Sequence, residues 1–480
     1  MKQYRLCRDS FIRTIEQYGY ITSQLTKHDR VYDAIGRMFL ISLSRTPQKI
    51  DTLLEKVVAH FENPPKEQIR VDLEEFLLDL ESDGYIVSGE TFEEIEEKEP
   101  KFSYAMENPK TTVYNYLQNK DDIKFNDTSD IFCDVFRTKP HIFACQIEVT
   151  NQCNERCIHC YIPHEAKNEL LPTEIILDTL MQLNQMGTLG LTISGGEAFI
   201  HPDIDKILLK ARELDFTINI LSNLTLIKPD HVTLLKKVNP SLVQTSLYSM
   251  NSEEHDHITK CKGSHTKTLT ALETLIEADI PVQISCPVMK TNLHSYKAVL
   301  QWAQEHRCKA QTDFIMMARS DLTTDNLNER LSIEETKELM ADILEVDIEY
   351  GALIDTPRKV KPVEQEKEEP VCGVGIDNIC LGANGNFYPC SGWQGYAVGD
   401  VRKETIVDMW QNSPQLQYLR TVKRKTFPQC LVCEDKYFCA MCLVRNFNES
   451  GGDMFNINRH FCEAAHINRL LVEEHKKTLV

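Results

Sequence analysis

The spacing of the cysteines constrains this chain more than any other sequence feature. Eleven of its seventeen cysteines fall into two groups, one between residues 150 and 160 and one after residue 370. The sequence does not open with the pattern of a secretory leader, so metal ligation is favoured over a disulfide framework. The first group is Cys153, Cys157 and Cys160; the second is Cys372, Cys380, Cys390, Cys430, Cys433, Cys439, Cys442 and Cys462.

Length and charge narrow the function classes. A chain of 480 residues predicts two or three domains. No long uncharged apolar stretch predicts a membrane span, and a cytoplasmic location is expected. The net charge of −19 disfavours nucleic acid as the main partner. It fits a basic partner or peptide, although it could equally serve solubility alone.

The first 90 residues predict a small α/β unit. Strand patterns are followed by a helical pattern, a second helix opening at Thr46-Pro47, and a third helix that Gly84 ends. Residues 91–140 are expected to be a linker, with the Glu-rich run Glu93–Glu99 forming a solvated linker or surface helix. The expected strands are Tyr18–Leu25 and Arg30–Asp33, and the expected helices outside the second are Ile35–Leu43 and Val71–Leu80.

From about His141 the pattern alternates short apolar runs with amphipathic helices. This predicts a parallel sheet with helices outside it, a partial barrel of about six βα units over residues 141–358. A boundary is expected in the proline- and charge-rich segment Lys359–Pro370. Residues 359–480 are then expected to form a domain organised by metal rather than by a large core. The predicted barrel strands are Gln146–Val149, Leu189–Ser194, Thr217–Leu221, Val243–Leu247, Val282–Val288 and Gln311–Ile315.

The first cysteine group follows the predicted strand Gln146–Val149, at the end of a barrel strand where such folds place chemistry. Three thiolates on one short loop can hold a [4Fe–4S] cluster and leave one iron without a protein ligand. A zinc site is the alternative, with His159 or His164 as the fourth ligand.

The loop Cys153-Asn-Glu-Arg-Cys157-Ile-His-Cys160, followed by Tyr161, resembles the CxxxCxxC signature of the radical S-adenosylmethionine (SAM) superfamily. The resemblance implies that SAM chelates the open iron and is cleaved to a 5′-deoxyadenosyl radical. It also implies a flavodoxin- or ferredoxin-type electron donor. Ser194-Gly195-Gly196-Glu197 resembles the family's GGE motif, in which the Glu accepts from the SAM ammonium group.

Two later residues resemble the family's remaining SAM positions. Asn223 and Ser246 resemble the residues that meet the SAM ribose and carboxylate. Each alone would indicate only a turn or cap, and their order after the cysteine loop favours the functional interpretation. Many relatives carry Asp where this chain has Tyr248.

The second cysteine group, with Gly385 five residues before Cys390, resembles the SPASM extension, which carries two auxiliary [4Fe–4S] clusters. Three clusters are therefore expected in all, and paired zinc ribbons are the alternative. A free buried cysteine is the alternative for Cys380. The resemblance implies that Cys372, Cys380, Cys390 and Cys442 hold one cluster and that Cys430, Cys433, Cys439 and Cys462 hold the other.

Among the remaining cysteines, Cys145 and Cys286 lie in predicted strands and are expected to be small core residues. Cys261 is flanked by lysines, which would lower the pKa of its thiol.

The N-terminal unit has the element order of a winged helix, whose usual ligand is DNA. Residues 1–100 carry 13 Lys and Arg against 20 Asp and Glu, which argues against a DNA-binding face. The run from Tyr18 to Leu43 resembles the small peptide chaperone of pyrroloquinoline quinone biosynthesis, the recognition element of many peptide-modifying enzymes. We expect residues 1–90 to bind an extended leader peptide by strand addition near Asp29–Asp33.

Together the three parts resemble the thioether-forming maturases of sactipeptides and ranthipeptides. The resemblance implies an enzyme that joins a cysteine sulfur to a carbon of an acceptor residue in a ribosomally made precursor peptide. Such a bond removes two hydrogens, and the auxiliary clusters would accept the electrons. Carbon–carbon or carbon–oxygen cross-linking, a formylglycine-type sulfatase maturase or another SPASM dehydrogenase are alternatives. A non-catalytic iron–sulfur carrier would not need Glu197.

Overall fold

The computed structural model describes residues 2–62, 64–105, 128–346 and 362–478. The N-terminal unit contains two small antiparallel sheets, with strand orders β2-β3-β4 and β5-β1-β6. Its helices bury Leu40, Leu53, Leu73 and Leu77 completely between them. The elements are β1 (Gln3–Leu6), β2 (Ser10–Ile15), β3 (Tyr18–Ser23), β4 (Asp29–Tyr32), α1 (Ala34–Ser42), β5 (Gln48–Lys49), α2 (Ile50–Val58), α3 (Lys66–Ser82), β6 (Ile86–Gly89) and α4 (Phe92–Lys98).

The strands and helices expected before residue 90 are confirmed, except for the start of the second helix. Thr46-Pro47 has the sequence of a helix start, but α2 begins at Ile50. The intervening residues pair with Gln3 and Tyr4 of β1 as the short strand β5, which keeps the backbone extended past the proline. Gly84 follows α3 with a φ of +75°, in the left-handed conformation that ends helices.

Of the two alternatives predicted for the Glu-rich run, the surface helix is confirmed and the linker is not. The run forms α4, which packs on β6 and buries Ile95 against Cys7 and Val87. Glu99 is only 5% exposed and, with Glu96, pairs with the buried Arg5. Buried carboxylates persist because this guanidinium bonds to both. Residues 106–127 of the expected linker lie outside the described residues.

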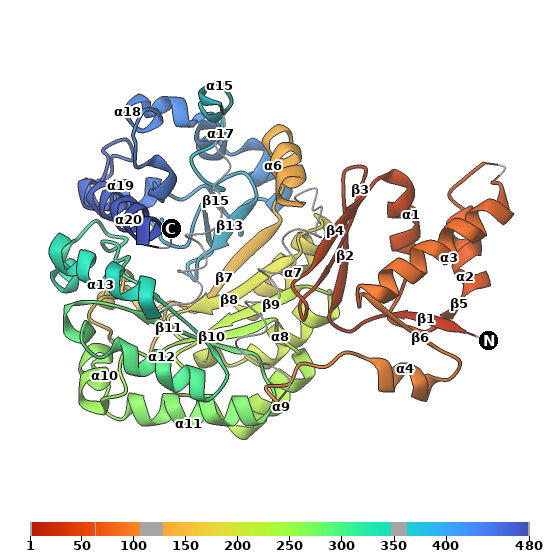
Figure 1. The fold of residues 1–480 in the computed structure, drawn as a ribbon, viewed down its shortest axis with the longest axis horizontal. Helices are drawn as coiled ribbons and strands as arrows, with labels where there is room; N and C mark the ends of the chain where they lie inside the picture. The colour runs from red at the N-terminus through yellow and green to blue at the C-terminus, as the bar shows by residue number, and fades with distance from the viewer. Residues whose placement is uncertain (1, 63, 106–127, 347–361, 479–480) are drawn as a thin grey trace.

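Six parallel strands form the sheet expected for the partial barrel, in sequential order from β7 to β12. They lie side by side at the centre of the molecule, with helices packed around them (Figure 1). Alternate residues such as Ile147, Ile193, Ile220 and Ile284 are fully buried against those helices. The strands are β7 (Ala144–Thr150), β8 (Gly190–Gly195), β9 (Thr217–Leu221), β10 (Leu242–Ser246), β11 (Val282–Pro287) and β12 (Lys309–Asp313). The helices between and after them are α7 (Thr173–Gln185), α8 (Ile204–Glu213), α9 (Pro229–Val238), α10 (Ser252–Thr259), α11 (Ser264–Glu277), α12 (Tyr296–Glu305) and α13 (Ile333–Val346).

The cysteine-rich tail continues this sheet, which the sequence did not predict. Strand β13 (Asn378–Leu381) pairs in parallel with β7, and Cys380 lies beside Gln146. Strands β14 (Asn386–Tyr388) and β15 (Gly399–Asp400) follow, so nine strands form one sheet. The tail's helices are α15 (Val363–Glu366), α16 (Ile406–Asn412), α17 (Pro414–Thr421), α18 (Pro428–Leu431), α19 (Leu443–Glu449) and α20 (Arg459–Thr478).

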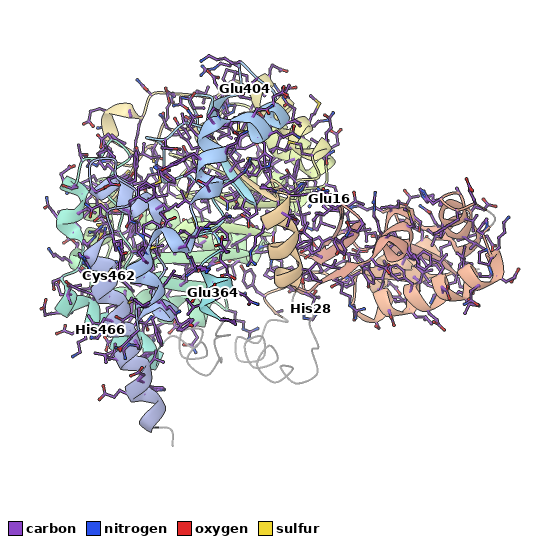
Figure 2. All side chains as sticks on the ribbon, turned by 90° about the horizontal axis from the view of Figure 1, so that it is seen from above. Glu16, His28, Glu364, Glu404, Cys462 and His466 are labelled. Atoms are coloured by element: carbon purple, nitrogen blue, oxygen red, sulfur yellow. The ribbon has the colours of Figure 1, made fainter. Side chains whose placement is uncertain are left out.

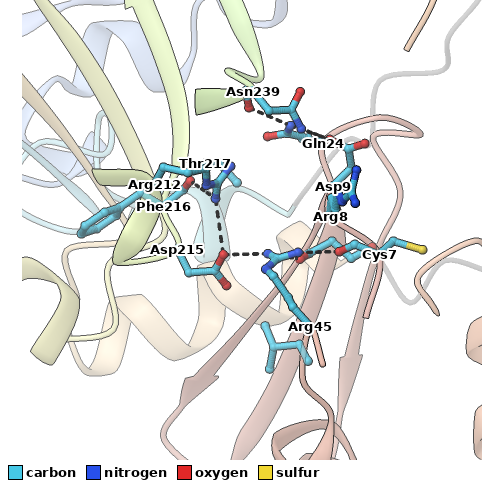
Figure 3. A network of polar contacts seen from close by, with 12 residues as sticks. Cys7, Arg8, Asp9, Gln24, Arg45, Arg212, Asp215, Phe216, Thr217 and Asn239 are labelled. Atoms are coloured by element: carbon cyan, nitrogen blue, oxygen red, sulfur yellow. Dashed lines mark hydrogen bonds and ion pairs between the residues drawn. The ribbon is translucent and has the colours of Figure 1, made fainter. Parts of the chain in front are cut away.

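The N-terminal unit is fastened to the ends of the barrel strands opposite the cysteine loop. Arg45 binds Asp215 at 2.6 Å and also donates to the Cys7 and Ser10 carbonyls (Figure 3). Asp215 follows α8 and Asn239 follows α9, both in left-handed conformations. The Asn239 carbonyl accepts a hydrogen bond from the Gln24 side chain of the N-terminal unit at 3.1 Å. Aromatic residues of α6 (Thr128–Thr138) add an apolar contact with Tyr20. Seen from above, the unit projects to one side of the junction near Glu16 and His28, while Cys462 lies at the other end (Figure 2).

Across the described ranges, no helix combines the length and the apolar character that a bilayer span requires.

Candidate functional site

The first cysteine group lies on the loop that leaves β7. Backbone hydrogen bonds from Arg156 and Ile158 to the end of α10 hold this loop in place. Burial raises the pKa of Cys157 well above its usual value, and the neighbouring Cys153 and Cys160 raise it further. Bound iron would stabilise the thiolate forms of these cysteines, which burial and their closeness otherwise disfavour.

Gly195 and Gly196 bring the end of β8 against this loop. A Cβ atom at Gly195, where φ is +139°, would lie 1.9 Å from the Thr150 carbonyl oxygen. One at Gly196 would lie 2.3 Å from the Gln152 carbonyl oxygen. The Gly196 N–H donates to that Thr150 carbonyl at 2.8 Å. Both glycines are therefore required by the close approach of two backbone segments.

Glu197 is 1% exposed and holds the loop after β9. Its carboxylate accepts from the Ser222 hydroxyl at 2.8 Å and from the Asn223 N–H at 2.7 Å. It also accepts from the Phe199 N–H at 3.0 Å. Burial raises its pKa to about 7, although these donors oppose the shift. A structural role for Glu197 thus accompanies the predicted contact with the SAM ammonium group.

Asn223 and the residues after β10 reach the same region. The Asn223 side-chain amide lies 3.9 Å from the Cys153 sulfur and donates to Asn154 at 3.0 Å. Ser246 ends β10, two residues before the buried Tyr248. The Tyr248 hydroxyl lies 3.3 Å from the His159 ring nitrogen. The structure therefore gathers the predicted SAM residues around the cysteine loop, and Tyr248 packs beneath it.

Tyr161 points into the barrel and donates to Glu148 at 3.2 Å. Gln394 from the tail donates to the other carboxylate oxygen at 2.7 Å. Glu148 is 1% exposed, and burial raises its pKa to about 7. Sequence reasoning missed Glu148 and Gln394. For Glu148, the only signal in the sequence was its charge inside an otherwise uncharged strand.

Four tail cysteines lie close enough to affect one another. Burial raises the pKa of Cys372 to about 11, and the neighbouring Cys442 and Cys390 contribute to this increase. Burial also raises the pKa of Cys380, and Cys390 contributes to the increase. Cys380 faces the barrel interior beside Gln146. These four cysteines are the first predicted auxiliary ligand set, which stays a prediction.

The remaining tail cysteines form a second neighbourhood. Burial and the nearby Cys462, Cys430 and Cys433 raise the pKa of Cys439 to about 11. These four cysteines are the second predicted ligand set, which also stays a prediction. Over the ranges described, no three His, Cys, Asp or Glu side chains converge on a single metal ion. A cubane cluster separates its ligands more widely than one ion does.

Burial shifts the pKa values of two residues near the cysteine loop, His159 and Cys261. His159, proposed as a zinc ligand, has its pKa lowered to about 4 by burial. The expectation that lysines lower the pKa of Cys261 is wrong. Burial and Glu155 raise it, and the lysine that opposes them is Lys267 rather than either flanking lysine.

The edge strand β4 exposes backbone groups away from its sheet. Ser23 donates to the His28 carbonyl at 3.0 Å and closes the β3–β4 hairpin. Hydrogen-bonded and non-bonded pairs alternate, so Ile21 and Arg30 form the next bonded pair. Val31, opposite Tyr20, therefore turns its N–H and C=O away from β3.

Two family models match this chain. Residues 147–303 match the Radical SAM superfamily, and residues 372–435 match SPASM, an iron–sulfur cluster-binding domain. The chain is an enzyme that contains a radical SAM domain and a SPASM domain. Its first match contains the cysteine loop, the GGE motif, Asn223 and Ser246.

The relatives that are similar to this chain carry different names. The antilisterial bacteriocin subtilosin biosynthesis protein AlbA of Bacillus subtilis is 26% identical over 349 residues, covering 70% of this chain and 76% of AlbA. An AdoMet-dependent heme synthase of Methanosarcina barkeri is 24% identical over 330 residues, covering 63% of this chain and 92% of the synthase.

Among solved structures, Streptococcus suis SuiB bound to its precursor peptide SuiA is similar in fold. The TM-score is 0.62 at 17% identity, over 92% of this chain and 96% of SuiB. At that identity the likeness establishes the fold alone.

Proposed function

We propose that this enzyme installs a thioether cross-link, from a cysteine sulfur to a carbon of an acceptor residue, in a ribosomally made precursor peptide. The observation that carries the proposal is the open edge of β4 on a unit fixed to a radical SAM barrel. An exposed strand edge can pair with an extended leader peptide. The similarity to AlbA supports a peptide substrate.

Three [4Fe–4S] clusters fit the chain's cysteines. Cys153, Cys157 and Cys160 would hold the cluster that binds SAM, and the two tail sets would hold the auxiliary clusters. When bound, the clusters supply the electron that cleaves SAM to a hydrogen-abstracting radical and accept the electron released when the thioether forms. A flavodoxin- or ferredoxin-type protein would deliver the reducing electron.

The chain's own residues orient this chemistry. Glu197 and Asn223 hold the β9 loop against Cys153, so the SAM-facing groups are fixed before SAM binds. Glu148 fixes Tyr161 at one of its carboxylate oxygens and Gln394 at the other. Burial of the surrounding side chains excludes water, which would otherwise quench a radical.

The test of leader recognition is Val31→Pro, with Val31→Ala as its matched control. Proline removes the outward N–H of an edge strand while leaving the β3–β4 pairs intact. We expect weaker precursor binding for Val31→Pro alone, measured by fluorescence anisotropy, with unchanged iron content in both variants. If both variants bind like the unchanged protein, the leader does not pair with β4.

The thioether is tested on the product. The modified peptide should be lighter by two hydrogens and should have one cysteine fewer that reacts with an alkylating reagent. A product of that mass with every cysteine still reactive would indicate a carbon–carbon or carbon–oxygen cross-link. Loss of two hydrogens without any cross-link would indicate a formylglycine-type oxidation or another dehydrogenation.

A further inference from the structure

The barrel face turned away from the helices carries a band of carboxamide side chains. Side chains alternate along each strand, so residues that pair across strands share a face. The pairings place the carboxamides on the face opposite the apolar residues that pack on the helices. They are Gln146 on β7, Asn219 on β9, Gln244 on β10, Gln283 on β11 and Gln311 on β12, and all are partly exposed.

From β9 to β12, the carboxamides lie progressively closer to the carboxyl ends of the strands, where the SAM site is predicted. Gln244 pairs directly with Gln283 on the neighbouring strand. Asn219 pairs with Leu242, two residues below Gln244, and Gln311 pairs with Ser285, two residues above Gln283. Two residues of strand correspond to about 7 Å. Ser246 is two residues beyond Gln244, so the band ends beneath the residues predicted to bind SAM.

Within the described ranges, four of these five carboxamides have no protein partner. Gln146 donates to the Ser194 hydroxyl at 2.7 Å. The side-chain amides of the other four make no hydrogen bond to any group in the described part of the chain. Each carboxamide offers two N–H donors and a carbonyl acceptor. This is the complement of a peptide backbone, which presents the same two kinds of group in alternation.

Charge on this face disfavours an anionic ligand. The six strands contain three charged residues, Glu148, Lys309 and Asp313. Lys309 pairs with Gln283 and shares this face, but it is exposed at the start of β12, the end away from the SAM site. The six strands therefore present no group of several Lys or Arg side chains that would bind the carboxylates of a porphyrin.

We infer that this carboxamide band binds the main chain of the peptide segment that is modified, and so fixes which residue faces the radical. The inference rests on the proposed peptide substrate and names the side chains that would bind its backbone. Recognition of backbone rather than side chains would let one enzyme accept varied sequences around the modified residue.

The test uses Gln244→Leu and Gln283→Leu, singly and together, with Gln185→Leu on the exposed end of α7 as the control. The probes are the synthetic core peptide encoded beside the gene, without its leader, and the same peptide N-methylated at one backbone nitrogen after another. Loss of neutral hydrogen bonds should weaken core-peptide binding about tenfold in the double variant. Iron content and peptide-independent SAM cleavage should stay normal.

N-methylation at the recognised positions should weaken binding to the unchanged enzyme but cause little further loss in the double variant. Equal losses in both proteins, or unchanged binding by the double variant, would overturn the inference while leaving peptide modification intact. If no peptide binds or reacts, but coproporphyrin III does, the proposed function itself fails.

Discussion

Gln394 of the SPASM domain donates a hydrogen bond across 2.7 Å to Glu148 of the first barrel strand. The bond joins residues that are 246 positions apart in sequence and links the two cofactor-bearing parts of the enzyme. Glu148 has almost no contact with solvent, so its charged form depends on Gln394 and Tyr161 for stabilisation.

Glu148 should make stability depend on pH. Burial raises its pKa from 4.5 to about 7, so the folded protein binds a proton that the unfolded chain has released. Its contribution is therefore most favourable below about pH 4.5 and falls as pH rises to about 7. Glu148→Gln should flatten that fall, which for one such group is on the order of 3 kcal/mol. Thermal unfolding at a series of pH values measures it. A pH profile identical to that of the unchanged enzyme would show that Glu148 is ionised in the folded state.

Removal of the first cysteine group should remove one cluster. The unchanged chain should hold about twelve irons after anaerobic reconstitution, and a Cys153, Cys157 and Cys160 triple alanine variant about eight, at four per cubane. Iron and sulfide assays give these values. Zinc in place of iron would contradict the cluster assignment.

Glu197→Ala should weaken SAM binding without affecting the clusters. The change removes the acceptor for Ser222 and Asn223 and the predicted partner of the SAM ammonium group. Loss of one charge-assisted bond should raise the SAM concentration for half-maximal cleavage about tenfold. 5′-Deoxyadenosine production measures this, with the exposed Glu174→Ala as control. Normal production at subsaturating SAM would exclude Glu197 from the site.

Arg45→Ala should loosen the N-terminal unit from the barrel. The side chain bonds Asp215 and two carbonyls of its own unit, so its loss should cost on the order of 1 kcal/mol at this partly exposed junction. Faster hydrogen exchange in β2 would report it. Lys139→Ala, which removes an exposed pair with Glu16, should leave exchange unchanged. Equal protection in both variants would mean that apolar contacts alone fix the unit.

The local parts of this structure could be predicted from sequence. The cysteine loop, the two glycines and the six βα units depend on neighbouring residues and on short-range periodicity. The start of α2 could not, because pairing of Gln48 with Tyr4 overrides the capping pattern at Thr46. The burial of α4 depends on Arg5, more than ninety residues before Glu99.

In the candidate site too, features set by neighbouring residues could be predicted and features set by distant residues could not. The motif containing Glu197 is contiguous and was recognisable. Glu148 acquires its role from Tyr161 and from Gln394, and no spacing rule connects the latter to it. The barrel carboxamides are each unremarkable in their own strand. They form a band only through the register of neighbouring strands.

The pairing of β13 with β7 limits how the tail can be studied. A chain ending before residue 372 would lose the strand that covers the edge of β7 and would expose unpaired backbone and apolar side chains. Such a truncated protein should aggregate, so its inactivity would say nothing about electron transfer. The shared sheet also removes any hinge between β7 and β13. The spacing between Cys380 and the loop that begins after Thr150 is therefore set by main-chain hydrogen bonding, and substrate must enter without these two segments moving apart.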